Sequence, residues 1–183
     1  EVKDGRLVVD KNFETSEPGV YAIGDLTADI QLAHVAAAQG TYMVEKIAGR
    51  PHSIKLEVVP NGMFVSLPIV PNCIYTDPEI ATVGITEEIA KKYGLKVRCG
   101  HFSMRDNGKS IITGEEHGFI RLLFEAYSNT IVGAQMMCPR ATDMIGEIAT
   151  AIANGLTAQE MSFAMRAQPT YNEGIGAAIE DAM

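Results

Sequence analysis

The feature of the sequence that most constrains the fold is a short apolar run that ends abruptly at Gly24 and Asp25. Residues 20–23 read Val-Tyr-Ala-Ile, a pattern typical of a buried strand. In an α/β fold, ligands bind where such strands end, because Gly lets a ligand approach the backbone and a following carboxylate accepts hydrogen bonds from hydroxyl groups. We therefore predict a buried strand with a sugar or polyol ligand beside Asp25. The alternative is a strand end and turn without a ligand.

A helix is expected over residues 30–48, directly after this strand. Its apolar residues recur at roughly helical spacing, Asp29 is placed to cap its start, and Gly49 with Pro51 ends it. One face of the helix is nearly all Ala, and small side chains let a helix pack close to a sheet or a flat ring. The start of a helix also presents free N–H groups to electron-rich atoms.

Composition excludes several classes of partner. The chain has 15 basic and 23 acidic residues, a net charge of −8, and its Lys and Arg residues are scattered. It therefore has no basic field to hold a nucleic acid backbone. No apolar run approaches the length of a membrane span. We expect neither nucleic acid nor a membrane as a partner.

The three cysteines, Cys73, Cys99 and Cys138, are odd in number and far apart. This pattern suits reduced, inert thiols in a cytoplasm better than a disulfide framework or a zinc site. We therefore expect a cytoplasmic protein without a metal site. The chain opens at Glu1 with neither a signal region nor a Met, which suggests that it is cut from a longer one.

A domain boundary is predicted at the end of a segment rich in helix and strand breakers. Residues 50–72 contain four Pro residues and the turn pair Asn61-Gly62, so they indicate a connector with at most short extended pieces. Residues 1–68 are assigned to a first domain and its connector. Residues 69–183 are assigned to a second domain.

The second domain is predicted to be α+β, an antiparallel sheet flanked by helices. Two apolar runs, residues 119–125 and 130–137, form a hairpin by their length and turn content. The other expected elements are a helix capped by Thr86 and ended by Gly94, a strand over 95–102, an exposed loop over 104–118, a helix that ends at Asn154-Gly155, and a short helix opened by the capping box Thr157 to Glu160.

Two stretches carry a resemblance to a known family. Residues 15–25, Thr-Ser-Glu-Pro-Gly-Val-Tyr-Ala-Ile-Gly-Asp, resemble the second FAD-binding motif of the pyridine nucleotide-disulfide oxidoreductases. Residues 73–84, Cys-Ile-Tyr-Thr-Asp-Pro-Glu-Ile-Ala-Thr-Val-Gly, resemble the opening of the dimerisation domain of that family. Within the family, the sequence is most similar to the dihydrolipoamide dehydrogenases. The first domain would then be a remnant of the FAD-binding domain, and the second the dimerisation domain.

The resemblance implies a set of residues that contact FAD. Gly24 and Asp25 match the motif in which the carboxylate holds the ribityl chain. Leu32, Ala33 and His34 resemble the family segment at the pyrimidine edge of the isoalloxazine ring. For His34 the alternative is a structural role, as for most single His residues on helices.

A stretch near the end of the sequence departs from the family at one position. Residues 166–173, Arg-Ala-Gln-Pro-Thr-Tyr-Asn-Glu, resemble the catalytic tail, in which a His directly before the Pro is oriented by a Glu and shuttles protons in the active site of the partner subunit. Gln168 stands at the His position, with Glu173 at the Glu position. An amide does not exchange a proton near neutral pH, and losing a positioned base removes about 10² to 10⁴ in rate. The alternative is a packed loop at the dimer interface.

Other parts of the family machinery are missing from this sequence. It contains no Gly-rich dinucleotide fingerprint after a strand and no Cys-x4-Cys pair. The resemblance therefore implies the C-terminal portion of a homodimeric enzyme that passes electrons from NAD(P)H through FAD to a lipoamide-type or other disulfide. The portion alone is expected to be inactive and to hold no cofactor.

Two other hypotheses stay open at this point. Loss of the catalytic His favours a non-catalytic interaction module that keeps the dimerisation fold. Alternatively, the intact enzyme keeps FAD and NAD(P)H and reduces an acceptor that is not a thiol compound, such as a quinone or oxygen.

Overall fold

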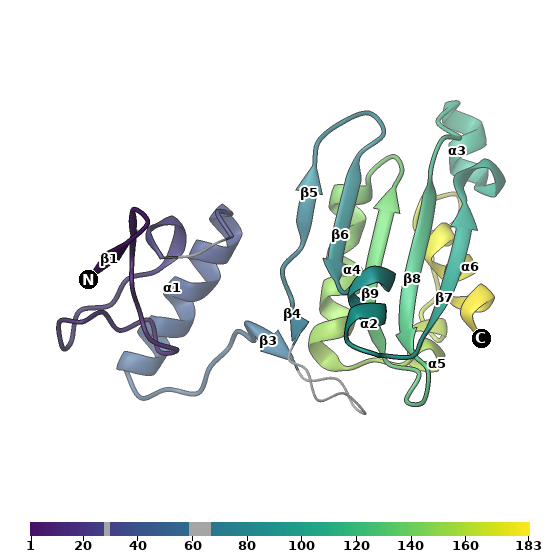
Figure 1. The fold of residues 1–183 in the computed structure, drawn as a ribbon. Coiled ribbons are helices and arrows are strands. Elements are labelled where there is room, and N and C mark those ends of the chain that lie inside the picture. The colour runs from purple at the N-terminus through teal and green to yellow at the C-terminus, as the bar shows by residue number, and fades with distance from the viewer. Residues whose placement is uncertain (28–29, 59–66) are drawn as a thin grey trace. The chain divides into compact units, whose positions relative to one another are not determined.

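The computed structural model describes residues 1–27, 30–58 and 67–183, which form two compact units, Glu1–Leu56 and Glu57–Met183 (Figure 1). The expected N-cap Asp29 and residues 59–66 of the breaker-rich segment lie outside the described residues. The domain boundary at residues 68 and 69 stays a prediction.

The first unit contains one long helix and little regular strand. The helix begins three residues later than expected, at Ala33, and ends at Ile47. The elements of this unit are β1 (Val2–Lys3), β2 (Arg6–Leu7), the 3₁₀ helix η1 (Gly24–Leu26) and α1 (Ala33–Ile47).

The prediction of a buried strand over residues 20–23 is wrong. Only Tyr21 makes a bridge, to Glu14, and Val20 is 49% exposed. A buried strand needs neighbouring strands on both edges. Within the part of the first unit that the structure describes, β1 and β2 are the only strands, and they pair with each other.

The second unit is built on a five-stranded antiparallel sheet in the order β5-β6-β9-β8-β7 (Figure 1). Two short strands of two residues each precede this sheet and pair with each other. The strands are β3 (Glu57–Val58), β4 (Leu67–Pro68), β5 (Asn72–Ile74), β6 (Ile80–Gly84), β7 (Val97–Ser103), β8 (Phe119–Glu125) and β9 (Ile131–Met137). The predicted α+β fold class and the predicted hairpin are confirmed.

Helices cover both faces of this sheet, with α4 and α6 on one face and α2 on the other (Figure 1). Strand β8 shows the alternation that feeds two cores: Leu122 packs towards α4 and α6, whereas Leu123 packs towards α2. The helices of this unit are α2 (Glu87–Lys92), the 3₁₀ helix η2 (Met104–Asp106), α3 (Gly108–Thr113), α4 (Ala141–Asn154), α5 (Ala158–Ser162) and α6 (Glu173–Ala182).

The predicted caps of three helices are confirmed. The hydroxyl of Thr86 accepts a hydrogen bond from the N–H of Ile89 at the start of α2. Thr157 and Glu160 form the complete capping box of α5. Gly155 ends α4 in the left-handed region, at φ 64°.

The prediction of an exposed loop over residues 104–118 is wrong, since this segment contains η2 and α3. The side chain of Asn107 accepts a hydrogen bond from the N–H of Ser110 at 2.9 Å and so caps α3, and Gly114 ends that helix at φ 73°. Met104 is fully buried. The helix signals were a short-range cap and a C-terminal Gly around only six residues, so periodicity could not reveal them.

Helix α6 was not predicted, although Ile175, Ala178, Ile179 and Ala182 recur at helical spacing and are buried. The helix lies close against β7 because Gly100 has no side chain. A Cβ at Gly100 would lie 1.8 Å from the carbonyl oxygen of Ala178.

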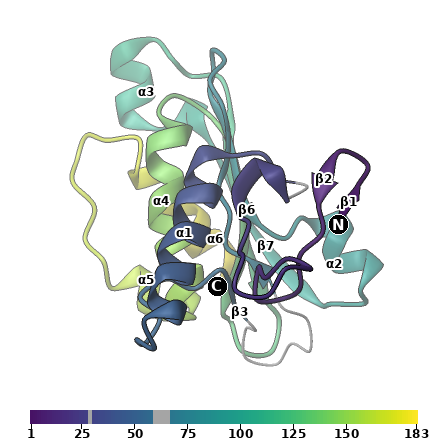
Figure 2. The same ribbon diagram turned by 90° about the vertical axis from the view of Figure 1, so that its left-hand side faces the viewer.

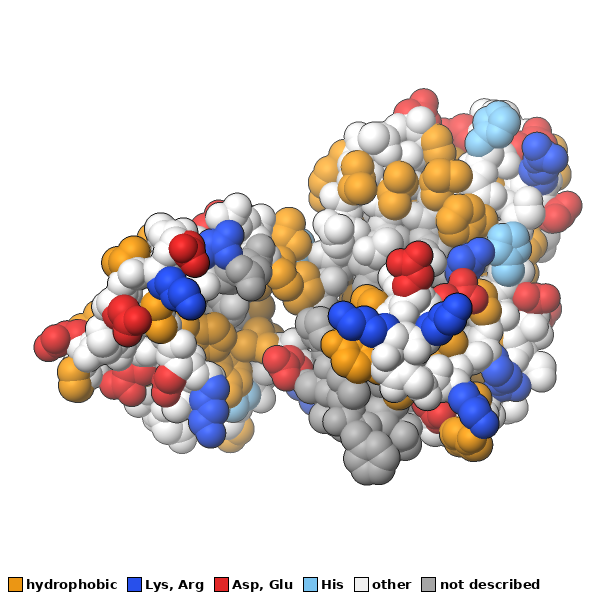
Figure 3. All heavy atoms as spheres, in the orientation of Figure 1, with side chains coloured by type: hydrophobic (Ala, Val, Ile, Leu, Met, Phe, Trp, Pro, Cys, Tyr) orange, Lys and Arg blue, Asp and Glu red, His pale blue; other side chains and the backbone are white. Residues whose placement is uncertain are grey.

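Charged side chains are mixed on the surface. On the face of the second unit drawn in Figure 3, Lys and Arg side chains lie among Asp and Glu side chains. This distribution agrees with the scattered basic residues of the sequence.

Candidate functional site

Gly24 and Asp25 lie together in η1, at the turn that precedes the long helix. Gly24 is buried at φ 66°, and its N–H donates a hydrogen bond of 2.7 Å to the side-chain oxygen of Gln39 on α1. A Cβ at Gly24 would lie 2.9 Å from the Cβ of Ala36. Glycine is therefore required here by the packing of η1 on α1, which presents Asp25 at the surface.

The predicted residues Leu32, Ala33 and His34 form the start of α1. Leu32 is the N-cap and supplies no side-chain cap, while Ala33 and His34 are exposed. A helix N-terminus favours electron-rich atoms, and an exposed carboxylate accepts hydrogen bonds from hydroxyls. The first unit thus offers, from Asp25 and from the start of α1, the two kinds of group that the polyol chain and the carbonyls of a flavin require.

Gln168 and Glu173 lie in and next to the connection between α5 and α6, which we call the tail and define as residues 163–172. Figure 2 shows this connection as a wide yellow-green loop beside α4. Gln168 is exposed, whereas Glu173 is half-buried as the first residue of α6. Both line a pocket of about 590 Å³ together with Phe102, Asn107 and Arg166. The structure therefore brings the two predicted residues to one pocket.

Glu173 supports the turn that carries Gln168. Its Oε2 accepts a hydrogen bond from the N–H of Thr170 at 2.9 Å. The hydroxyl of Thr170 donates to the carbonyl of Ala167 at 2.6 Å, and the amide of Asn107 donates to the carbonyl of Thr170 at 3.1 Å. Glu173 thus accepts a hydrogen bond from the backbone of Thr170, two residues after Gln168, and does not bond to Gln168 through this contact.

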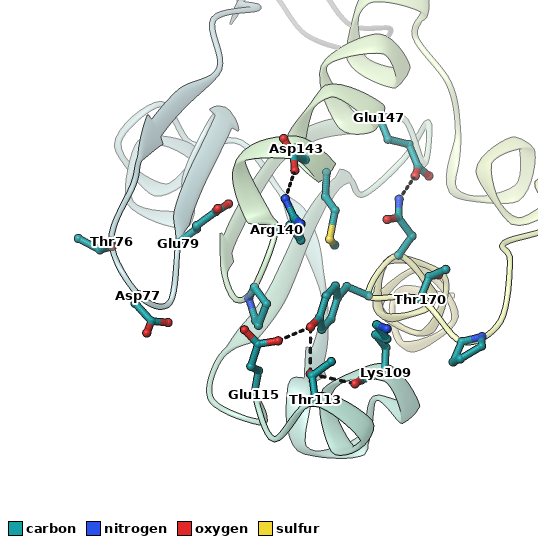
Figure 4. A pocket seen from close by; sticks show the side chains of 15 residues that line it. Thr76, Asp77, Glu79, Lys109, Thr113, Glu115, Arg140, Asp143, Glu147 and Thr170 are labelled. Atoms are coloured by element: carbon teal, nitrogen blue, oxygen red, sulfur yellow. Dashed lines mark hydrogen bonds and ion pairs between the residues drawn. The ribbon is translucent and has the colours of Figure 1, made fainter.

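A larger pocket of about 1030 Å³ lies on the other side of the tail, between α3, α4 and the turn from β5 to β6 (Figure 4). Here the hydroxyl of Tyr171 bonds to the carboxylate of Glu115 and lies 3.0 Å from the hydroxyl of Thr113. Burial and the bond to Glu115 raise the pKa of Tyr171, and the same bond lowers the pKa of Glu115. Sequence reasoning missed this contact because it joins segments that are far apart in the chain.

The family match is decided by the second unit. Residues 70–179 match the family described as pyridine nucleotide-disulphide oxidoreductase, dimerisation domain, and residues 1–40 match the family described as pyridine nucleotide-disulphide oxidoreductase. The chain belongs to the pyridine nucleotide-disulfide oxidoreductase family. The resemblance seen in the sequence is confirmed.

Relatives of this pyridine nucleotide-disulfide oxidoreductase chain include dihydrolipoyl dehydrogenases. That of Bacillus subtilis is 36% identical over 96% of the chain and 35% of the relative, and that of Chlorobaculum tepidum is 34% identical over 100% of the chain and 37% of the relative. The chain therefore spans about a third of the length of these relatives.

Two solved structures share the fold of the chain. LpdA from Mycobacterium tuberculosis matches with a TM-score of 0.85 and 27% identity over 97% of this chain and 37% of that one. The HOCl-induced flavoprotein disulfide reductase RclA from Escherichia coli matches with a TM-score of 0.81 and 18% identity over 100% of this chain and 39% of that one. At that identity the likeness concerns the fold alone.

The thiols of this family member are poorly suited to redox work. Burial, and to a smaller extent the charge of Glu79, raises the pKa of Cys138 to about 12. Burial is also the main cause of the raised pKa values of Cys73 and Cys99, to which Glu79 and Glu87, respectively, contribute less. Because the thiolate is the reactive form, these raised pKa values make all three thiols less reactive near neutral pH than an ordinary cysteine. In the described ranges, no three His, Cys, Asp or Glu side chains gather as a metal site would require.

No helix in the described part of the family member combines the length and the apolar character that crossing a membrane demands.

Proposed function

We propose that this chain is the C-terminal, dimer-forming portion of a FAD-dependent NAD(P)H oxidoreductase similar to the dihydrolipoyl dehydrogenases. In the intact protein, Gly24, Asp25 and the segment Leu32 to His34 contact FAD. The exposed carboxylate and the start of α1 support this assignment. The chain alone holds only this part of a flavin site and is expected to be inactive.

The observation that carries the proposal is the placement of Gln168. It is exposed on a turn that Glu173 supports, at the position where the family resemblance implies a proton carrier. In a homodimer, this turn would face the flavin of the second subunit. The amide of Gln168 can form hydrogen bonds to the electron acceptor but cannot exchange a proton with it near neutral pH.

The proposed electron acceptor is therefore one of two kinds. A lipoamide-type or other disulfide would be reduced slowly for want of a base. An acceptor that is not a thiol compound, such as a quinone or oxygen, needs no such base. The three cysteines are free and form no disulfide with one another, which supports a reducing, cytoplasmic location.

The test is Gln168→His in the native protein that contains this chain. Restoring an imidazole should raise the rate of dihydrolipoamide oxidation by about 10² to 10⁴, and Gln168→Asn, which also lacks a titratable group, should give no gain. The control measurement is bleaching of the flavin by NADH, which neither variant should change. A reducible flavin without any gain from His would instead favour the non-thiol acceptor.

A protein without flavin, or whose flavin is not bleached by NADH or NADPH, would contradict the enzyme proposal and favour the interaction module. Dimer formation is tested by gel filtration of the native protein. Elution at the monomer mass across micromolar concentrations would contradict the homodimer.

A further inference from the structure

Few backbone hydrogen bonds support the tail, so its conformation depends on side-chain contacts. The N–H groups of Phe163 and Ala164 donate hydrogen bonds to carbonyls of α5. From residue 165 to residue 172, no backbone N–H donates to a backbone carbonyl of the described residues. A segment without such bonds has a single conformation only if side-chain contacts fix it.

One carboxylate, that of Glu147 on α4, contacts both ends of this segment. Arg166 donates from Nη2 to Oε1 of Glu147 at 2.6 Å, and Asn172 donates from Nδ2 to Oε2 at 3.1 Å. Figure 4 shows Glu147 directed from α4 towards the tail. Arg166 precedes Gln168 by two residues and Asn172 follows it by four, so the two bonds bracket the turn.

The ionic bond between Glu147 and Arg166 is partly shielded from water. The side chain of Arg166 is 11% exposed and that of Glu147 is 34% exposed. Arg166 also donates to the carbonyl of Ala164 at 3.3 Å, and its Nη1 lies 3.5 Å from where a Cβ on Gly176 would be. Shielded, charge-assisted hydrogen bonds are stronger and less screened than exposed ones.

The same helix offers an exposed pair for comparison, one turn earlier. Asp143 pairs with Arg140 at 3.3 Å, and the two side chains are 69% and 68% exposed. An exposed pair of this kind contributes little to stability, and neither member hydrogen-bonds to the tail.

We propose that Glu147 is a positioning residue of the reaction: its carboxylate clamps Arg166 and Asn172 and thereby fixes the direction in which Gln168 meets the electron acceptor. The inference rests on the proposed function for its catalytic consequence. The clamp itself is a property of this chain that can be measured without any cofactor or acceptor.

The first experiment is amide hydrogen exchange of the native protein, followed by mass spectrometry of peptides that cover residues 163–172. In Glu147→Ala, exchange should be at least about tenfold faster at Thr170, whose N–H is bonded to Glu173 and can therefore report loosening of the turn, because both anchors are lost together. Glu147→Gln should be intermediate, since one amide oxygen can still accept a hydrogen bond. Asp143→Asn, the matched control, should stay within about twofold of the unchanged protein.

A second variant keeps the test sound if Glu147→Ala does not fold. Arg166→Met retains much of the aliphatic bulk of Arg166 and removes its hydrogen bonds, and it should also speed exchange in the tail. Equal acceleration in peptides of β8 and β9 would overturn the proposal, because Glu147 would then stabilise the whole unit. Exchange in the tail that matches Asp143→Asn would overturn it as well.

The second experiment separates positioning from stability by kinetics. In Glu147→Ala, kcat/KM for the acceptor should fall by about tenfold or more, since small misplacements of an active-site group cost this much. The rate of flavin reduction by NADH should stay within about twofold. A fall in flavin reduction of the same size would contradict the role in the acceptor step. If flavin is never reduced, the proposed function fails while the exchange experiment still decides the clamp.

Discussion

The two units of the chain differ in how much of their apolar surface they bury within themselves. In the second unit, Ile148 of α4 is fully buried against the sheet, whereas Val44 of α1 in the first unit is 67% exposed. Both helices were predicted from the same kind of periodic pattern. The comparison shows that a pattern predicts a helix in either case, while burial of its apolar face depends on which strands are available to cover it.

The same comparison explains the failed strand of the first unit. The hairpin of β8 and β9 formed because each strand has partners along both edges in the five-stranded sheet. Residues 20–23 belong to no strand: they make one isolated bridge, between Tyr21 and Glu14, with backbone hydrogen bonds to its two flanking residues. A strand is stabilised by its neighbours, so an apolar run without them stays irregular.

The largest expected effect contrasts the two helices directly. Ile148→Ala should lower the free energy of unfolding of the second unit by about 2 to 5 kcal/mol, because it removes buried methyl groups and leaves a cavity. Val44→Ala should change stability by less than about 0.5 kcal/mol. Urea unfolding followed by circular dichroism measures both, since the chain has no Trp. Similar losses in the two variants would contradict the contrast between the units.

The next effect concerns how closely α6 approaches the sheet. Gly100→Ala should cost about 1 to 3 kcal/mol or more, because the new Cβ would overlap the carbonyl of Ala178 and push α6 away. The control is Gly108→Ala, where a Cβ would meet nothing within 4 Å. Thermal unfolding compares the two, and a Gly100→Ala variant as stable as Gly108→Ala would show that α6 is free to shift.

The smallest effect is a pH dependence at the turn of the hairpin. Glu125 is 4% exposed, and its Oε2 accepts hydrogen bonds from Tyr127 and from the N–H and hydroxyl of Ser128. Burial raises the pKa of Glu125, but the bonds from Ser128 and Tyr127 outweigh burial and leave the pKa below its ordinary value. Its stabilisation is therefore complete above the unfolded pKa, near 4.3, and is lost as the pH falls through the folded pKa.

Glu125→Gln should thus cost about 1 kcal/mol at pH 7, the difference between a charge-assisted and a neutral hydrogen bond. The difference in the free energy of unfolding between Glu125→Gln and the unchanged chain, measured by denaturant titration, should shrink below about pH 4. A gap that is constant from pH 7 to pH 3 would show that the charge of Glu125 has no part in holding the turn. The exposed Glu88→Gln variant is the control and should show no comparable gap.

Part of the candidate site was readable from the sequence. Gln168 and Glu173 were found from the residues around the Pro-Thr pair, and they do line one pocket. Glu147 and Asn107 were not found, because they contact the tail from α4 and from the start of α3. The bond from Tyr171 in the tail to Glu115 was missed for the same reason. Such contacts join residues that are distant in the chain, and short-range patterns carry no information about them.

The sequence by itself determined the family, the α+β class, the hairpin, and the caps at Thr86, Thr157 and Gly155, because these depend on spacing, turn residues and hydrogen bonds within a few positions. Only the tertiary structure decided that residues 20–23 lack strand partners, that Gly100 admits α6, and that Glu147 anchors the tail. Those outcomes depend on which surfaces meet in space, and packing between distant segments selects them.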